Sequence, residues 1–194
     1  KSEAETEAEA KDDAASGDLI VVGYAQVGAE SDWRTANTES FKSTFTEENG
    51  YKLIFDDAQQ KQENQIKAIR SFIQQDVDYI VVAPVVETGW EAVLQEAQEA
   101  GIPVILSDRQ MDVDESLYEC WVGGNFIKEG ETAGNWLADY LKAQGRDGED
   151  INIVTLQGTI GASAQVGRTE GFGNILKQHD NWKMLDMQTG EFTQ

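Results

Sequence analysis

Cysteine is nearly absent from this sequence, because Cys120 is the only one in 194 residues. A single cysteine cannot form a disulfide within the chain, so cysteine usage does not indicate an oxidising or a reducing compartment. Its neighbours Tyr118, Trp121 and Val122 are typical of a strand. We therefore expect the Cys120 thiol to be buried and inert rather than reactive.

Basic residues are also scarce: 15 Lys and Arg stand against 36 Asp and Glu, for a net charge of −21. Affinity for nucleic acid depends largely on basic contacts to phosphates, so this balance argues against a nucleic-acid partner. It argues equally against an anionic membrane surface as the main partner. A strongly acidic chain is well suited to staying soluble, and we expect a monomer.

Long apolar runs and a visible signal peptide are missing too, so no membrane span is expected and the chain fits a mature or a trimmed protein. Residues 1–18 are rich in Glu, Ala, Ser and Asp and hold no large apolar side chain. Such a stretch cannot bury enough surface to offset its ordering entropy. We predict a disordered acidic linker, of a kind that could tether a domain to a membrane through a lipid anchor.

Motifs for catalysis are sparse, with no Gly-x-Ser-x-Gly elbow and no Cys/His spacing for a metal. His179, the only histidine, lies at an expected helix end, where the helix dipole accounts for it better than acid–base chemistry. A glycosidase needs a carboxylic acid, but Asp108 stands beside Arg109, which favours the ionised form. We expect neither an enzyme nor a bound metal or cofactor.

From residue 19 onward, strand-like and helix-like segments alternate. Strands are expected at 19–24, 51–55, 79–83, 104–107, 117–122, 151–156 and from 184, and helices at 33–48, 64–75, 88–100, 127–143 and 163–177. This alternation predicts an α/β fold of βαβ units with parallel sheets and right-handed crossovers. The glycine pair at 123–124 interrupts it, so we expect one lobe at 19–122 and a second, truncated lobe at 123–194.

Polar and aromatic side chains follow several expected strands. Ligands of parallel α/β sheets bind outside the carboxyl ends of the strands, which share one edge. A carboxylate accepts hydrogen bonds from hydroxyls and a guanidinium donates several, so the two together suit a neutral polyol. The side chains expected to meet at this edge, from both lobes, are Gln26, Trp33, Arg34, Asp108, Arg109 and Arg168.

Plainer interpretations exist for these residues. Asp108 and Arg109 could form a solvated ion pair in a loop. Trp33 could cap its helix instead of offering an apolar face to a sugar ring.

Other residues near the strand ends are interpreted structurally. Trp90 is expected in the core. Glu30 and Asp32 fit a solvated acidic helix start, which the helix dipole favours. Residues 158–161, Gly-Thr-Ile-Gly, lack the Gly-Lys-Ser/Thr ending of a phosphate loop and predict an ordinary strand-to-helix turn.

Five segments together resemble the ribose/galactose class of bacterial periplasmic sugar-binding proteins, the substrate-binding components of ABC importers, and most of all its galactofuranose-binding members. They are VGYAQVGAESDWR (22–34), QQKQENQIKA (59–68), APVVETGW (83–90), LSDR (106–109) and LQGTIGAS (156–163). The resemblance runs from about residue 19 to residue 194. It implies the periplasmic-binding-protein-like type I fold, in which two Rossmann-like lobes close over one sugar.

The resemblance also implies roles for residues. Asp108 and Arg109 clamp sugar hydroxyls, the first loop brings Gln26, Trp33 and Arg34, the second lobe brings Arg168, and Phe192 stacks on the ring. The remaining second-lobe ligands of this class lie beyond residue 194. The class usually has Arg or Lys where Gln194 stands.

The leading hypothesis is therefore an extracytoplasmic receptor for a monosaccharide, galactofuranose or a related aldose, that delivers it to an ABC permease. Its expected place is the periplasm or the outer face of the cytoplasmic membrane, where a lipid anchor would hold it. The alternative is the sugar-responsive effector core of a LacI-type transcription repressor. That protein needs a basic helix-turn-helix before the core, and here an acidic linker occupies that position.

Overall fold

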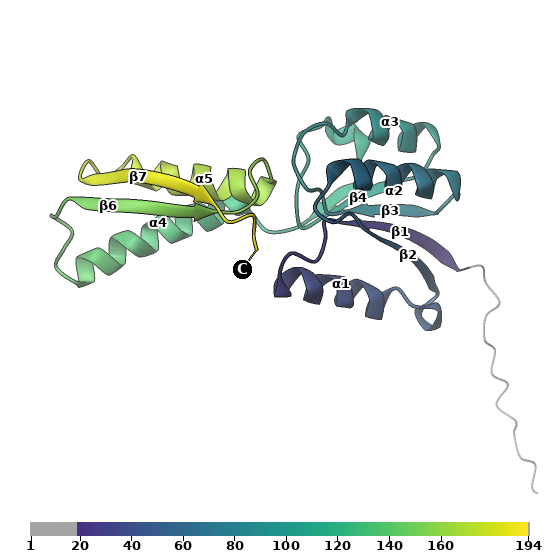
Figure 1. The fold of residues 1–194 in the computed structure, drawn as a ribbon, viewed down its shortest axis with the longest axis horizontal. Helices are drawn as coiled ribbons and strands as arrows, with labels where there is room; N and C mark the ends of the chain where they lie inside the picture. Colours follow the sequence, from purple (N-terminus) through teal and green to yellow (C-terminus); the bar gives the residue numbers. More distant parts are fainter. Residues whose placement is uncertain (1–18, 194) are drawn as a thin grey trace, which may run out of the picture.

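The computed structural model describes residues 19–193. The acidic linker predicted for residues 1–18 lies outside the described residues, as does Gln194. Figure 1 shows two separate bodies of sheet and helix joined by a thin crossing. We call residues 20–122 the first lobe and residues 126–193 the second lobe.

The first lobe is built on a five-stranded parallel sheet in the order β2-β1-β3-β4-β5. Its strands are β1 (Ile20–Gln26), β2 (Tyr51–Asp57), β3 (Tyr79–Val82), β4 (Val104–Ser107) and β5 (Cys120–Val122). All four pairings are parallel, so every carboxyl end lies on the same edge. The predicted parallel α/β fold is confirmed.

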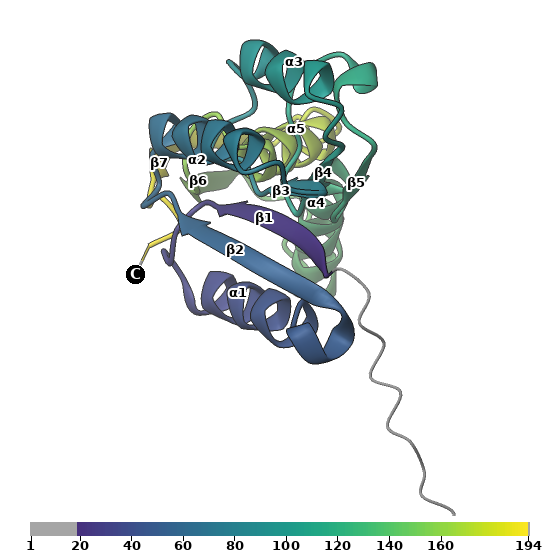
Figure 2. The ribbon, with the colours of Figure 1, turned by 90° about the vertical axis from the view of Figure 1, so that its right-hand side faces the viewer.

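Helices cover both faces of this sheet because the strands are apolar on both sides. Helix α1 (Asp32–Thr44) lies on one face, and α2 (Gln62–Gln74) and α3 (Glu91–Glu99) lie on the other (Figures 1 and 2). On the α1 face, Tyr24 stacks on Phe41 with ring centroids 4.1 Å apart. On the opposite face, Ile80 packs with Ile69 and Leu94 in the larger core.

Three expected boundaries were wrong by three residues or more, each for a local reason. The helix predicted at 33–48 ends at Thr44, because Thr46 caps a separate 3₁₀ turn, η1 (Glu47–Asn49). The helix predicted from residue 88 starts at Glu91, after an irregular loop. The strand predicted at 117–122 begins at Cys120, since η2 (Glu115–Leu117) takes its first part.

The expectation of a buried thiol was also wrong, because Cys120 is exposed. Strand β5 is short and forms the edge of the sheet, so it has cover on fewer sides than the central strands. The apolar neighbours of Cys120 in sequence indicated a strand correctly but said nothing about its place in the sheet.

The second lobe has two parallel strands and two helices among the described residues. They are α4 (Phe126–Ala143), β6 (Ile151–Gln157), α5 (Ser163–Leu176) and β7 (Trp182–Thr189). Helices α4 and α5 share a core with one face of the strands through Leu141, Ile175 and Trp182. Side chains on the other face remain open: Val154 is 72% exposed and Leu156 is 78% exposed.

Candidate functional site

A cleft of about 450 Å³ lies where the carboxyl ends of the first lobe's strands face the second lobe. Side chains from both lobes line it. Six of the seven predicted site residues are among them: Trp33, Arg34, Asp108, Arg109, Arg168 and Phe192. The geometry that the sequence predicted, with polar ends of separate elements meeting at one edge, is therefore present.

Arg34 enters the cleft because α1 begins just before it. Ser31 is the N-cap, and its side chain accepts a hydrogen bond from the Arg34 backbone N–H at 3.2 Å. The Arg34 guanidinium is buried and donates to Asp108 Oδ2 at 2.7 Å. Such a charge-assisted hydrogen bond, between a buried guanidinium and a partly buried carboxylate, fixes both side chains.

Asp108 occupies a strained position directly after β4. Its φ is 63°, a left-handed conformation that non-glycine residues seldom adopt. The neighbouring strand holds it there: its N–H donates to the Val122 carbonyl at 2.7 Å, and its own carbonyl accepts from Trp121 Nε1 at 3.1 Å. Strain of this kind persists only where the surroundings enforce it, and it clusters at functional sites.

Arg109 is buried, and its side chain bonds to the loop after β3. Its Nη1 donates to the Val85 carbonyl at 3.2 Å, and its guanidinium lies 5.1 Å from the centroid of the Phe192 ring. Burial, helped by the neighbouring positive charge of Arg34, lowers the pKa of Arg109 to about 10. Arg109 therefore remains a cation at neutral pH, in a place where an unmatched cation is costly.

Glu30 supplies the matching charge, and sequence reasoning missed it. We expected a solvated helix start, but the Glu30 side chain is only 2% exposed and lies between two guanidiniums. Its Oε1 is 3.1 Å from Arg34 Nε and 3.6 Å from Arg109 Nη2. The four-residue spacing between Glu30 and Arg34, typical of a helical ion pair, was the available signal.

The second carboxylate oxygen of Glu30 is an unused acceptor in the cleft. Glu30 Oε2 is buried and has no hydrogen-bond partner among the residues that the structure describes. A buried acceptor without a donor costs free energy unless a ligand or water supplies one. Glu30 itself is one of the residues that line the cleft.

Gln26 is the predicted site residue that the structure does not bring into the cleft. Its side chain is fully buried beneath α1. Its amide donates to Asn37 Oδ1 at 2.9 Å and to Thr38 Oγ1 at 3.0 Å, and its Oε1 accepts from the Val27 N–H. All of these groups belong to the first lobe, so Gln26 ties β1 to α1.

The second lobe contributes a cation and an aromatic ring. Arg168, on α5, pairs with Glu129 of α4 at 2.8 Å. Phe192 has a left-handed backbone, with a φ of 60°, and its ring lies so close to Gly158 that any Cβ there would collide with it. The ring is thereby fixed between the second lobe and the Arg109 guanidinium.

Trp33 lies at the edge of this arrangement. It is 57% exposed, and the Arg34 guanidinium carbon lies 4.8 Å from its ring centroid. Both earlier interpretations of Trp33 fit this position. It lies in the first turn of α1, just after Asp32, and it also lines the cleft.

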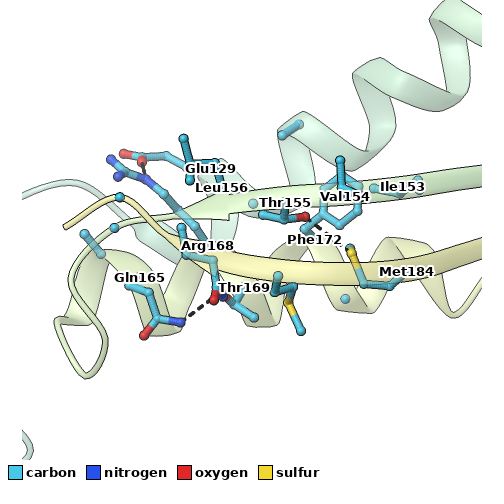
Figure 3. Close-up of a pocket in the computed structure, with 18 of the residues that line it drawn as sticks. Glu129, Ile153, Val154, Thr155, Leu156, Gln165, Arg168, Thr169, Phe172 and Met184 are labelled. Carbon is cyan, nitrogen blue, oxygen red and sulfur yellow. Dashed lines mark hydrogen bonds and ion pairs between the residues drawn. The ribbon is translucent and has the colours of Figure 1, made fainter. Parts of the chain in front are cut away.

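A larger hollow of about 900 Å³ lies within the second lobe (Figure 3). Residues of α4, β6, α5 and β7 line it, and its walls include apolar side chains such as Ile153, Phe172 and Met184. Arg168 and Glu129 stand at one end of it. We assign the candidate site to the smaller cleft, because buried charges from separate elements converge there and a polar ligand needs them.

The structure also places two further residues that the sequence singled out, Trp90 and His179. Trp90 is fully buried in the core, as expected, and its Nε1 donates to the Val86 carbonyl at 2.7 Å. His179 stacks on Trp182, with ring centroids 4.1 Å apart. Within residues 19–193 there is no cluster of His, Cys, Asp and Glu suited to a metal ion. None of the helices in that range has the length and apolar character to cross a membrane.

The fold and this site define a class of protein. Residues 22–194 match the periplasmic binding protein domain, and the chain belongs to that family. The galactofuranose-binding protein YtfQ of Escherichia coli K12 is 49% identical over 175 residues, which are 90% of this chain and 53% of that protein. The fructose import binding protein FruE of Bifidobacterium longum is 31% identical over 89% of this chain and 51% of its own length.

Solved structures give the same picture. A Mycobacterium smegmatis protein in complex with β-D-fucofuranose has 52% identity and a TM-score of 0.84, covering 90% of this chain and 57% of that one. The periplasmic binding protein component of the arabinose ABC transporter from Shewanella sp. ANA-3, bound to α- and β-L-arabinofuranose, has 49% identity and a TM-score of 0.81, covering 89% and 55%. The chain therefore spans about half the length of the relatives it matches.

Proposed function

We propose that the protein containing this chain is an extracytoplasmic receptor that captures a monosaccharide in its furanose form and delivers it to the permease of an ABC importer. Three of the four relatives above support this ligand class, since they are described with galactofuranose, β-D-fucofuranose and L-arabinofuranose. Family membership supports a place in the periplasm or at the outer face of the cytoplasmic membrane. Monomeric action and a lipid anchor belong to the same proposal.

The observation that carries the proposal is the pairing of charges in the cleft. Arg34 and Arg109 are matched by Glu30 and Asp108 from separate elements. The four formal charges sum to zero, so a neutral ligand leaves the balance intact, whereas an acidic sugar adds an unmatched charge. This composition favours a neutral polyol.

A sugar bound in this cleft would meet hydrogen-bond partners for its hydroxyls and an apolar surface for its ring. The guanidiniums of Arg34 and Arg109 donate hydrogen bonds to hydroxyl oxygens, and the carboxylates of Asp108 and Glu30 accept from hydroxyl hydrogens. The Phe192 ring offers an apolar surface to the C–H face of the sugar ring. A sugar with the wrong hydroxyl pattern would leave buried polar groups unpaired, which is how such sites discriminate.

We further propose that the protein releases its sugar unchanged. The Asp108 carboxylate already accepts a hydrogen bond from the buried Arg34 guanidinium at 2.7 Å, so its place in the cleft is that of a fixed acceptor for ligand hydroxyls. Hinge closure of two lobes would trap the ligand without forming or breaking a bond.

Calorimetry with a panel of neutral sugars and their acid analogues, on the full-length protein, tests this function. We expect one site that takes a neutral furanose. The Arg109→Ala variant should weaken binding by about 2–5 kcal/mol, because it removes one partner of a buried charge pair. Arg70→Ala is the matched control, since Arg70 pairs with Glu96 on an exposed helix face. Absence of binding to any mono- or disaccharide refutes the proposal.

A further inference from the structure

Two hydrogen bonds join the lobes beside the cleft, outside the set of residues that line it. The Gln110 backbone N–H of the first lobe donates to Ser163 Oγ of the second lobe at 2.9 Å. The Glu87 backbone N–H donates to the Gly161 carbonyl, also at 2.9 Å. The Gly161 carbonyl lies in the turn before α5, which the sequence marked only as an ordinary turn, and Ser163 is the first residue of α5.

The Ser163 hydroxyl bonds to the first lobe instead of capping its own helix. It is the first residue of α5 and is only 3% exposed. The side chain of the N-cap, Ala162, cannot cap the helix, and no side-chain capping bond is formed there. Instead, Gln165 Oε1 accepts from the Gly161 N–H at 3.1 Å, while the Ser163 oxygen accepts from the first lobe.

The first-lobe residues that bond to the start of α5 also hold the Arg109 side chain in place. Gln110 follows Arg109 directly, and Arg109 Nη1 donates to the Val85 carbonyl two residues before Glu87. The Asp112 N–H donates to the Glu87 carbonyl at 2.8 Å, which joins the two segments. Residues 85–87 and 109–112 therefore form one unit that carries both the Arg109 guanidinium and the contact with the second lobe.

Helix α5 carries the cation of the second lobe. Arg168 lies five residues after Ser163 on the same helix and lines the cleft opposite Arg109. A rigid helix transmits the position of its first turn to its second, so the Ser163 contact sets where Arg168 lies relative to the Arg109 guanidinium. Resting on the proposed sugar-receptor function, we propose that Ser163 is a positioning residue. Its hydroxyl acts as a latch: it holds the start of α5 against residues 109–112 and so keeps the two lobes in the arrangement that binds the ligand.

The test is the Ser163→Ala variant of the full-length protein, with Ser43→Ala as a matched control. Ser43 is exposed, and its hydroxyl donates within the first lobe to the Ser40 carbonyl at 3.1 Å. Losing one hydrogen bond from the gripping arrangement should weaken sugar affinity about three- to tenfold. The loss should appear as faster dissociation with little change in the association rate, because the latch acts after encounter.

A second readout separates the latch from the receptor function. Small-angle X-ray scattering of the sugar-free protein should give a larger radius of gyration for Ser163→Ala than for the wild type or Ser43→Ala. Equal radii, or an unchanged dissociation rate with only a lower melting temperature, overturn the latch. If the wild type binds no sugar, the receptor proposal fails, and the scattering comparison still decides whether Ser163 holds the lobes together.

Discussion

At the scale of single residues, Glu30 contributes a counter-charge that the two guanidiniums of the cleft share. It is a buried carboxylate shared by two buried guanidiniums, and it keeps one oxygen free. Without it, Arg34 and Arg109 would have only Asp108 as a close counter-charge. The free oxygen also gives the site an acceptor that discriminates by hydroxyl position, since any ligand lacking a donor there leaves it unpaired.

The Glu30→Gln variant tests this role while keeping the shape of the side chain. Removing the charge leaves a guanidinium partly unmatched, so we expect the free energy of unfolding to fall by about 2–4 kcal/mol and sugar affinity to fall with it. Urea denaturation and calorimetry measure the two effects. Glu39→Gln, at an exposed pair with Lys42, should change neither by more than about 0.5 kcal/mol. Equal behaviour of the two variants would show that Glu30 is not a counter-charge.

Glu87 gives a residue-scale prediction about pH. Burial, together with the negative charge of Asp112, raises the pKa of the Glu87 carboxyl above its usual value. The folded form then binds this proton more tightly than the unfolded form, so stability is lost as pH rises through the raised pKa. Glu87→Gln lacks that loss. We expect it to be slightly more stable than the wild type at pH 7, with the difference vanishing in acid, as thermal melts across pH will measure.

At the scale of elements, α4 and α5 approach each other through small residues. A Cβ at Gly171 of α5 would collide with the Ile127 carbonyl of α4, so the close packing of the helices depends on the absence of a side chain. Gly173, two residues later, has open space where its Cβ would be. The same substitution therefore has opposite consequences at two positions of one helix.

We expect Gly171→Ala to destabilise the protein by about 1–3 kcal/mol, because the helices must move apart. Gly173→Ala should stabilise it by about 0.5–1 kcal/mol, since alanine loses less conformational freedom in a helix. Chemical denaturation of both variants measures the contrast. A gain in stability at Gly171 would contradict the packing described here.

The order of elements was predictable from the sequence because it depends on apolar periodicity. Boundaries failed where a single polar contact decides them, as at Thr46, which starts a new turn after α1. The contacts made by side chains at the strand ends were harder to predict. Gln26 ends β1 and Asp108 directly follows β4, yet Gln26 bonds to α1 and Asp108 lines the cleft. Alternation places neighbouring side chains on opposite faces, but it does not say which face a helix covers.

At the scale of the whole molecule, the two lobes are unequal. The first has a closed core on both faces of its sheet. The second keeps one face open at Val154 and Leu156, and the relatives that match this chain are about twice as long. Because the cleft lies between the lobes, its affinity depends on their arrangement as well as on the residues that line it.

A crystal structure of the full-length protein with galactofuranose or L-arabinofuranose tests the central claim most directly. The account predicts that the sugar ring lies against Phe192, with hydroxyls within hydrogen-bond distance of Asp108, Arg109 and Glu30 Oε2. A sugar bound in the apolar hollow beside β6, or one that contacts neither Asp108 nor Arg109, would contradict it.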